Sequence, residues 1–489
     1  MILFESSFII FTILIIFLYY TFLKNYQWQL LLVGSLFFYY YFTKSNFIFF
    51  SIINTFVFGL LIEKVEKKQL KKTLLILCLL INFGLLFLIK YSNFFANKYG
   101  ILIPLGISFY MFQSISYVID VYRGSYKSEK NPFKFALFVS YFPQIIQGPI
   151  GRYNKLAPQM FKKHEYNSSD FRYGFETICW GAFKKIFIAD RIATFVNAVF
   201  ANYEGYYGAV IFLAVFAYSI QIYTDFSGGI DIVRGISQIL GIELDVNFRR
   251  PFFARSVSDF WRRWHITLSA WMKDYVFYSL NLSKPLAFIN KKARKALGNK
   301  TGKLISVCIS TYILYFIVGI WHGAGSNYVF YGLWNGTIIS LSLYFESYFK
   351  KIKKKLHITD YTNWFMLFQI LRANVLVTLG RYFSRADSAK TAFAMLKRTF
   401  TQFSFADVKL ATLYDMGYTF NGIAALILCI LIVFVVDLCF EKKVNLYKKF
   451  DSANTFIQLL VITIFVLLIV FGVIYAEGYV STEFIYRQY

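Results

Sequence analysis

Five runs of apolar residues in this chain contain no charged side chain, and most approach the length that an α-helix needs to cross a membrane. They cover residues 7–23, 73–89, 304–320, 422–436 and 452–476. Inside the ~30 Å hydrocarbon layer every backbone polar group must find its partner within the protein, which favours helices. A mean hydropathy of +0.51 over 489 residues agrees with these runs. The sequence therefore predicts a membrane protein and excludes a soluble one.

Seven weaker apolar runs are interrupted by glycine, proline or a lone polar group: residues 28–43, 47–62, 101–118, 135–147, 207–223, 327–343 and 365–379. With the first five they give about 11 or 12 crossings. The first run has no basic leader and follows Glu5, so we expect a retained helix and not a signal peptide. Internal repeats and long linkers are not evident. We therefore expect an all-α, polytopic membrane protein that forms one domain over residues 1–489.

The formal net charge of +26 comes largely from short basic segments between the apolar runs. Residues 64–72 carry five Lys or Arg, residues 284–303 seven, residues 350–355 five and residues 442–449 four. This distribution is typical of cytoplasmic loops, and it argues against a nucleic-acid partner. Placing these segments in the cytoplasm predicts that both termini are extracytoplasmic, including the C-terminal tail at residues 480–489.

The cysteines and histidines do not suggest a metal site. The five cysteines are scattered, contain no C-x-x-C pair, and lie mostly in apolar runs, where we expect small core residues. The four histidines include no i, i+4 pair. A serine or cysteine triad is also disfavoured, because no G-x-S-x-G turn is present and no cysteine neighbours a histidine.

One histidine, His322, stands at the end of the charge-free run 304–320, within G-I-W-H-G-A-G at residues 319–325. Ionisable groups at membrane depth are costly and usually face a protein interior or a cavity. The three glycines beside it allow a backbone or a ligand to approach the ring. A catalytic histidine and an interfacial histidine bonded to a backbone carbonyl both fit this position.

The middle of the chain, residues 101–278, breaks the regular pattern with prolines and charged residues, which favours re-entrant or broken helices. We expect the functional site here. One polar, irregular segment is predicted to face a cavity, and it contains Pro143, Gln144, Gln147, Gly148, Pro149 and Arg152.

Residues 249–278 predict an amphipathic helix along an interface or over a cavity. Apolar residues recur there at spacings of four and three: Val257, Trp261, Trp264, Leu268, Trp271 and Tyr275. The segment is too charged to span a membrane. His265 falls on the opposite, polar side. By position alone it is either a solvated histidine or a second functional group near His322.

Several motifs in this central region resemble the membrane-bound O-acyltransferases, in particular the bacterial branch of alginate and peptidoglycan O-acetylation and teichoic acid D-alanylation. The matching segments, in order, are P-L-G-I-S-F-Y-M-F-Q-S-I-S-Y-V-I-D-V-Y-R-G at 104–124, Y-F-P-Q-I-I-Q-G-P-I-G-R-Y at 141–153, D-F-S-G-G-I-D-I at 225–232, D-F-W-R-R-W-H-I-T-L-S at 259–269 and W-H-G-A-G at 321–325. The resemblance implies a ring of helices around a central funnel. It also implies that His322 is the catalytic residue and His265 the second histidine of the site.

The resemblance further implies transfer of an acyl group from a cytoplasmic thioester to an acceptor on the outer side. A neutral imidazole acting as general base on a hydroxyl contributes ~10² to 10⁴ in rate, so His322 is the expected base. His265 is expected to orient the donor or stabilise an oxyanion. The donor is acetyl coenzyme A or a carrier-protein thioester, and no permanently bound cofactor is expected.

The last six residues, F-I-Y-R-Q-Y, resemble the Phe-x-Tyr-x-x-aromatic ending of the same branch. The resemblance implies that Tyr486 accepts the acyl group and passes it to an extracytoplasmic partner of the hydrolase-like SGNH type. The alternative is an aromatic interfacial anchor. The expected acceptor is a cell-wall polysaccharide, with peptidoglycan ahead of alginate. D-alanyl transfer, another acceptor, and a transporter remain as alternatives.

Overall fold

The structure, a computed structural model, describes residues 2–43, 45–91, 104, 106–360, 362–474 and 484–485. The side chains of residues 2, 448 and 468–474 are not described. Regular structure in the described parts is entirely helical, which confirms the all-α prediction. Tyr486 and residues 480–483 and 487–489 of the predicted tail lie outside the described residues.

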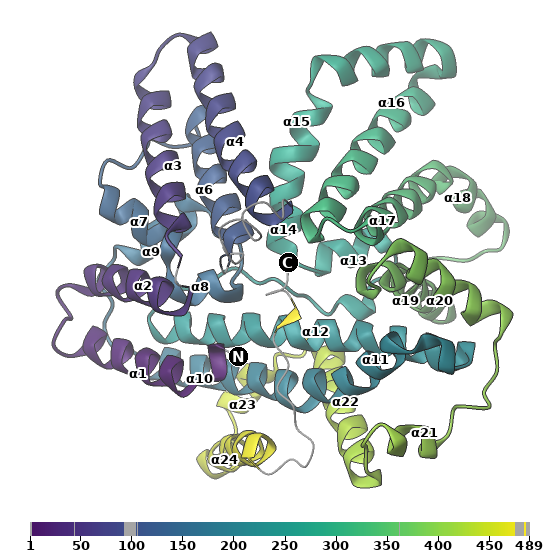
Figure 1. Ribbon diagram of the computed structural model, residues 1–489. Coiled ribbons are helices and arrows are strands. Elements are labelled where there is room, and N and C mark those ends of the chain that lie inside the picture. The colour runs from purple at the N-terminus through teal and green to yellow at the C-terminus, as the bar shows by residue number, and fades with distance from the viewer. Residues whose placement is uncertain are drawn as a thin grey trace.

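The first half of the chain forms the left and lower parts of Figure 1. Its helices are α1 (Ser6–Tyr20), α2 (Gln27–Thr43), α3 (Phe47–Lys64), α4 (Lys68–Tyr91), α6 (Ile107–Tyr122), α7 (Pro132–Ser140), α8 (Phe142–Gln147), α9 (Tyr153–Met160), α10 (Ser168–Phe183), the π-helix η2 (Lys184–Ala189), α11 (Asp190–Ala201) and α12 (Gly208–Ile239), with the 3-10 turns η1 (Ile2–Phe4) and η3 (Tyr203–Gly205).

The second half completes the circuit around the centre of the molecule (Figure 1). Its helices are the 3-10 turn η4 (Pro251–Phe253), α13 (Val257–Arg263), α14 (Ile266–Trp271), the π-helix η5 (Met272–Phe277), α15 (Tyr278–Asn281), α16 (Lys284–His322), α17 (Ser326–Tyr344), α18 (Glu346–Lys355), α19 (Asn363–Arg385), α20 (Ala389–Thr401), α21 (Leu410–Asp415), α22 (Phe420–Glu441), α23 (Leu446–Asp451) and α24 (Thr455–Ile474).

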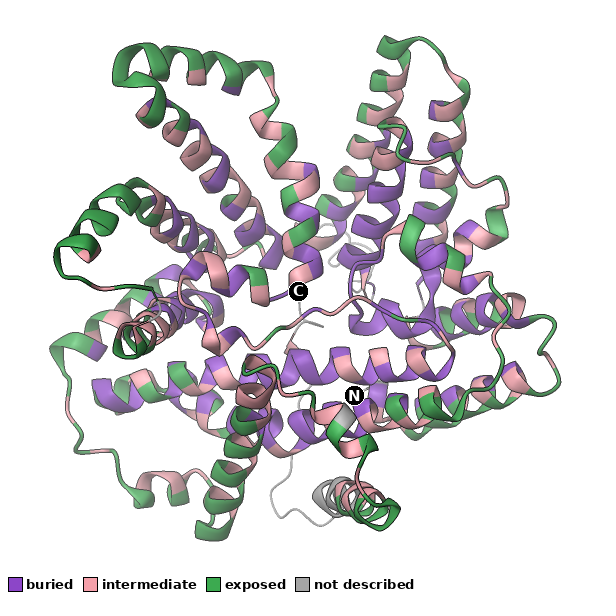
Figure 2. Ribbon diagram, turned by 180° about the vertical axis from the view of Figure 1, so that it is seen from behind, coloured by how far each residue is buried: buried purple, intermediate pink, exposed green. Residues whose placement is uncertain are grey.

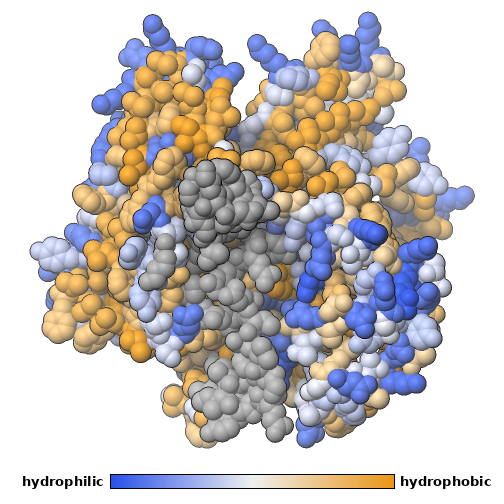
Figure 3. All heavy atoms as spheres, viewed as in Figure 1, coloured by the Kyte–Doolittle hydropathy of each residue, from blue (hydrophilic) through white to orange (hydrophobic). Residues whose placement is uncertain are grey.

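Helix α12 lies at the centre of the packing, whereas α22 lies at the periphery. In their most apolar stretches 72% of the residues of α12 are buried, against 6% for α22 (Figure 2). Isoleucine, leucine and phenylalanine side chains of α22 are exposed, as are several on α4. Apolar side chains also cover the outer arms of the molecule in Figure 3. Exposed apolar surface of this extent fits contact with lipid.

Five described helices are long and apolar enough to cross a membrane: α3, α4, α12, α16 and α22. Two shorter apolar stretches are also helical: α1, and residues 455–467 of α24. The fold thus confirms a polytopic membrane protein. The expected 11 or 12 crossings and the orientation of the termini stay predictions.

The structure corrects three sequence-based expectations. Residues 249–278 do not form one helix, because the chain breaks between α13 and α14 at His265. The run that begins at residue 207 is not a broken helix, because α12 continues for 32 residues through Asp225 and Asp231. The basic segment 284–303 is not a loop, because α16 includes it and kinks only at Gly298.

Two helix pairs approach so closely that their contact points must be glycine. On α10 and α12, a Cβ atom at Gly181 would lie 2.5 Å from the carbonyl oxygen of Gly228. On α16 and α17, a Cβ at Gly332 would lie 2.3 Å from the carbonyl oxygen of Tyr315 and 3.2 Å from Gly319 Cα. Small residues that allow backbones to approach are typical of helix packing in membranes. The second crossing lies one turn before His322 and thereby positions the end of α16.

Candidate active site

His322 is the last residue of α16 and is buried, with 6% of its surface exposed. Its ring centroid lies 5.4 Å from that of Tyr331 and 6.2 Å from that of Tyr328, both on α17. Gly319 serves the α16–α17 contact, and the helix ends at the extended Gly323. The irregular backbone predicted around this histidine therefore begins only after it.

His265 is also buried, with 1% of its surface exposed, so it is not a solvated interfacial histidine. It occupies the junction of α13 and α14 with φ 44° and ψ 54°, a left-handed conformation that is uncommon outside glycine. This break turns the side chain away from the polar helix face predicted for it. Phe226 of α12 and Phe109 of α6 flank its ring at centroid distances of 4.9 and 6.0 Å.

The side chain of Asn247 holds the break in place. Its Oδ1 accepts hydrogen bonds from the Thr267 backbone N–H at 2.9 Å and from Thr267 Oγ1 at 2.8 Å, and it lies 3.4 Å from His265 Nδ1. Because a backbone N–H only donates, the atom at this position is the oxygen, and His265 Nδ1 must donate to it. The neutral ring then carries its proton on Nδ1, which leaves Nε2 as the basic nitrogen.

Trp321 brings the two histidines into one site. Its indole lies 4.8 Å from the ring of His322 and 5.9 Å from that of His265, centroid to centroid. The two predicted site histidines, 57 positions apart in the sequence, thus contact the same side chain. The other two histidines lie elsewhere: His164 packs against Tyr19 of α1, and His357 is exposed.

Two cations, the half-buried Lys90 and the buried Arg381, complete the surroundings of His322 and were missed by the sequence analysis. The Lys90 ammonium donates to the carbonyl oxygen of Trp321 and lies 5.4 Å from its indole. Arg381 of α19 is 2% exposed and donates to the Tyr331 hydroxyl at 3.4 Å. Both are close enough to His322 for electrostatic interaction. The available signal was a charge close behind an apolar run, since Lys90 directly follows residues 73–89 and Arg381 comes two residues after the run 365–379.

Lys90 and its neighbour Tyr91 also cap the end of α16. The Tyr91 hydroxyl donates to the carbonyl oxygen of Ile320, next to the Trp321 carbonyl held by Lys90. The last carbonyls of a helix have no partner within it, and the helix dipole places negative charge there. A cation and a hydroxyl at this position therefore stabilise the turn that carries His322.

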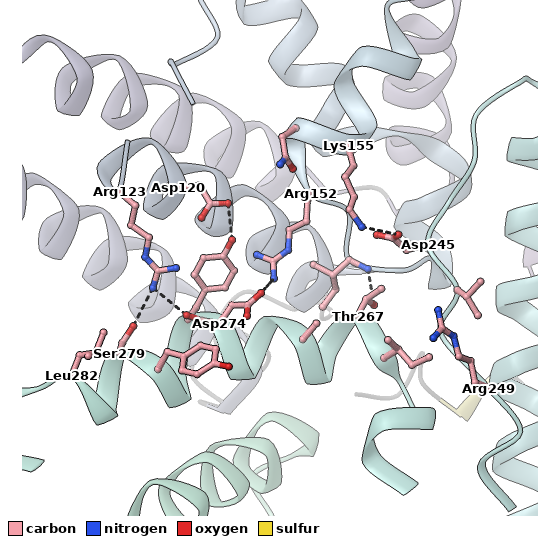
Figure 4. A pocket seen from close by; sticks show the side chains of 17 residues that line it. Asp120, Arg123, Arg152, Lys155, Asp245, Arg249, Thr267, Asp274, Ser279 and Leu282 are labelled. Atoms are coloured by element: carbon pink, nitrogen blue, oxygen red, sulfur yellow. Dashed lines mark hydrogen bonds and ion pairs between the residues drawn. The ribbon is translucent and has the colours of Figure 1, made fainter. Parts of the chain in front are cut away.

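A charged cavity of about 710 Å³ opens at the start of α14, which directly follows His265 in the sequence (Figure 4). Ile266 and Thr267, the two residues after His265, line it. Its charged residues are Asp120, Arg123, Arg152, Lys155, Asp245, Arg249 and Asp274. Arg152 pairs with Asp274 at 2.9 Å and Lys155 with Asp245 at 3.3 Å, whereas no ion pair of Arg249 occurs among the described residues.

The polar segment predicted to face a cavity divides into two parts. Arg152 and Ile150 line the charged cavity, and the Ile150 N–H donates to Thr267 Oγ1 at 3.1 Å. Gln144 instead bonds within the core to Gln113 Oε1 at 2.7 Å. Gln147 is buried, and its amide atoms have no hydrogen-bond partner in the described part of the chain.

The C-terminal end of the chain approaches the same region. Phe484 is 5% exposed, and the Ile485 N–H donates to Asp225 Oδ2 at 2.9 Å. Asp225 directly precedes Phe226, whose ring flanks His265. Tyr486, the predicted relay, is the next residue in the sequence and lies outside the described residues.

Groups that could hold a metal do not occur among the described residues, since no cluster of three His, Cys, Asp or Glu is found there. Cys78 and Cys179 are buried and the other three cysteines are half-buried, as expected of small core residues. The site that the described residues form is thus built from imidazole, indole and amide groups and from two cations, Lys90 and Arg381.

The fold and the site together define a class of protein: an integral membrane protein with two buried histidines in its site. The sequence profile of MBOAT, the membrane-bound O-acyltransferase family, matches residues 127–379. The chain belongs to this family.

Among similar proteins, a probable alginate O-acetylase of Pseudomonas aeruginosa is 30% identical, and the match covers 88% of this chain and 80% of that protein. The peptidoglycan O-acetyltransferase of Helicobacter pylori is 30% identical over 71% of this chain and 68% of that protein. The teichoic acid D-alanyltransferase of Bacillus subtilis is 30% identical over 51% of this chain and 61% of that protein.

The extent of these matches varies. Probable alginate O-acetylases of Pseudomonas syringae and of Azotobacter vinelandii are each 33% identical to this chain. The chain spans 57% of the length of the first and 60% of the length of the second.

Proposed function

We propose that this chain is a membrane-bound O-acetyltransferase that passes an acetyl group from a cytoplasmic thioester across the membrane for O-acetylation of an extracytoplasmic polysaccharide. The observation that carries the proposal is the pair of buried histidines that both pack against Trp321. Family membership and the names of the relatives support acyl transfer as the reaction.

In the proposed reaction His322 acts as general base. Its neutral imidazole takes the proton of the acceptor hydroxyl while the hydroxyl oxygen attacks the thioester carbonyl. The carbon–sulfur bond then breaks, and the departing thiolate takes up the proton from the imidazolium. Lys90 and Arg381, both close to His322, stabilise the negative charge that develops on the carbonyl oxygen.

His265 orients the donor in this proposal. Its Nδ1 is held by Asn247, so the orientation of Nε2 is fixed before the substrate binds. Hydrogen bonds from Thr267 hold Asn247 in turn, and Thr267 also lines the charged cavity. This chain of contacts connects the cavity to the imidazole.

We further infer that the charged cavity admits the donor. Coenzyme A and a carrier-protein thioester both carry phosphate, for which arginine is a suitable partner. Arg249, which is exposed and has no ion pair within the described residues, is the side chain we expect to meet it. Both donors fit this chemistry, and acetyl coenzyme A is the simpler expectation.

Tyr486 is proposed as a relay that accepts the acetyl group on its hydroxyl and delivers it to an extracytoplasmic SGNH-type acetyltransferase. The docking of Phe484 and Ile485 beside α12 supports this, because Tyr486 follows them directly. Tethering raises the effective concentration of the acceptor without new contacts. Tyr486→Phe keeps the ring and removes the acceptor, so polymer acetylation is expected to stop, whereas Tyr489→Phe is expected to act mildly.

The final acceptor is proposed to be a cell-wall polysaccharide reached from the cytoplasmic membrane. Peptidoglycan was favoured because it is widespread, and relatives named for alginate and for peptidoglycan both match the chain. D-alanyl transfer to teichoic acid is the second candidate, favoured by the match to a teichoic acid D-alanyltransferase. A transporter would show internal symmetry, which the sequence lacks.

Labelling in membranes tests the reaction and the donor together. Membranes containing the full chain are incubated with acetyl coenzyme A or with a D-alanyl carrier-protein thioester, each labelled in the acyl group, and the labelled polymer is identified. We expect label from acetyl coenzyme A in polysaccharide, and none with His322→Ala at an equal membrane level. Wild-type labelling with His322→Ala would refute His322 as the base, and labelling from the carrier protein alone would establish the second candidate.

A further inference from the structure

A buried ion cluster joins η2, α11 and α12. One ammonium, Lys185 Nζ, lies between two carboxylates, 2.6 Å from Asp225 Oδ1 and 2.7 Å from Asp190 Oδ1. The side chains of all three residues are at most 1% exposed. Isolated buried charges are costly unless they are paired and hydrogen-bonded. An N–H donor that reaches a carboxylate of this cluster adds to its stabilisation.

The donor that reaches it is the backbone of the chain's own C-terminal end. The Ile485 N–H donates to Asp225 Oδ2, while Asp225 Oδ1 faces Lys185. Each carboxylate oxygen of Asp225 therefore has its own donor. A hydrogen bond to an ionised acceptor within a low-dielectric interior is among the stronger ones in proteins.

The adjoining aromatic ring is held by a second set of contacts. The Phe484 ring lies 4.7 Å from Lys185 Nζ, a cation–π distance. Gly229 of α12 also approaches this ring, since a Cβ at that position would lie 3.1 Å from Phe484 Cε1. The same Cβ would lie 2.1 Å from Gln147 Oε1. The unpartnered amide of the buried Gln147 is thus a neighbour of the docked ring.

We propose that Asp225, Lys185 and Gly229 form a docking site for the C-terminal tail of this chain, which recognises the Phe484 ring and the Ile485 backbone N–H. Asp225 and Lys185 are positioning residues, since they hold the tail and take no part in the transfer. We infer that they hold the tail so that the following residue, Tyr486, is presented to the histidine site, and this step rests on the proposed function. The docking itself rests on the contacts of residues 484 and 485.

Photo-cross-linking in the full-length protein tests the docking. A phenylalanine analogue that carries a diazirine replaces Phe484, membranes are irradiated, and cross-linked peptides are mapped by mass spectrometry. We expect an intramolecular product, migrating as the monomer, that joins residue 484 to α8, α12 or η2. A product on other helices, or one between two copies of the chain, would overturn the proposal.

Variants of the tail separate recognition from folding, because they leave the membrane helices intact. Ile485→Pro removes the N–H that Asp225 accepts, and we expect the cross-link yield to fall at least about tenfold, on the scale of losing one bond to a charged acceptor. Ile485→Ala keeps the N–H and is the matched control, expected to retain most of the yield. Equal yields from the two variants would refute recognition through this backbone group.

A third variant distinguishes this proposal from the relay. Tyr486→Phe is expected to cross-link at the wild-type yield, since the contacts that define the docking site are made by the Phe484 ring and the Ile485 N–H. Normal cross-linking together with normal polymer acetylation in this variant would refute the relay and support the docking site. Loss of the cross-link in Tyr486→Phe would contradict docking through residues 484 and 485.

Discussion

His265 combines a left-handed backbone with a side chain fixed by Asn247, so its position is specified by the surroundings and not by helix geometry. Residues held in such conformations outside glycine concentrate at functional sites. Replacing the imidazole while keeping the turn isolates the chemistry. Asparagine suits this purpose, because it tolerates the left-handed region better than most residues.

We predict that His265→Asn and His265→Ala each lower acetyl transfer by about 100-fold, within the range of one acid–base or orienting group. Purified His265→Asn is expected to keep the thermal stability of the wild type in detergent. Ser258→Ala, on the preceding helix α13, is the control and is expected to remain active. If it loses as much activity as the histidine variants, the role assigned to His265 is wrong.

The role of Lys90 is the most difficult one to predict from the sequence. Lys90→Met keeps the length of the side chain and removes the ammonium that caps α16 and faces Trp321. We predict a fall in acetyl transfer on the order of 100-fold, the size expected when a reacting group is misplaced by about 1 Å. Lys68→Met, at the exposed start of the same helix, is the control. Initial rates at saturating donor measure the effect, and an unchanged rate for Lys90→Met would contradict it.

At this scale the sequence identified the histidines and missed what surrounds them. His322 and His265 lie within motifs that the family resemblance made interpretable. Lys90 stands 231 positions before Trp321, and a single sequence does not show that α4 and α16 meet. The burial of His265 was missed for a similar reason, because the break beside it is imposed by Asn247, a residue outside the periodic pattern.

At the scale of elements, the crossing of α16 and α17 determines where His322 is held. A Cβ at Gly332 would meet the carbonyl oxygen of Tyr315 and the Cα of Gly319, which are backbone atoms and cannot rotate away. The two helices must therefore separate to accept even one methyl group. Because His322 ends α16 one turn later, such a separation displaces the proposed base.

We predict that Gly332→Ala destabilises the protein by about 1–3 kcal/mol, the usual cost of overpacking. We also expect the variant to lower acetyl transfer by a larger factor than it lowers the amount of protein in the membrane. Gly84→Ala in α4 is the matched control, because nothing lies within 4 Å of its Cβ and alanine favours a helix. Thermal unfolding in detergent and polymer acetylation are measured for both. Equal behaviour of the two alanine variants would show that the crossing tolerates separation.

Most elements were predictable from apolar runs, and the exceptions have physical causes. The run from residue 207 was expected to break at its aspartates, but α12 continues because η2 supplies Lys184 to Asp231 at 2.6 Å and Lys185 to Asp225. The basic segment before residue 304 was expected to be a loop, yet it is helical, since lysine and arginine are good helix formers. Charge pattern indicated location relative to the membrane and not backbone conformation.

For the molecule as a whole, the distribution of lysine predicts an orientation that cysteine labelling tests. In a background without the five native cysteines, Cys at Lys68 or Lys354, both exposed, is expected to react only after the cells are opened. Ser6→Cys, at the exposed N-terminus, is expected to react with the same reagent in intact cells. Labelling of residue 68 or 354 in intact cells would reverse the orientation and place the tail on the side of the donor.

The ion pairs of α12 also bear on how the chain enters the bilayer during synthesis. Lys184 and Lys185 leave the ribosome about forty residues before Asp225 and Asp231. Neither group of charges is well suited to lipid alone, since each ionisable side chain at the centre of a helix opposes insertion. Joined as in the folded protein, they neutralise one another, and the glycine contacts between α10 and α12 let the two backbones close around them. The ion pairs between η2 and α12 can therefore form only after α12 has been synthesised.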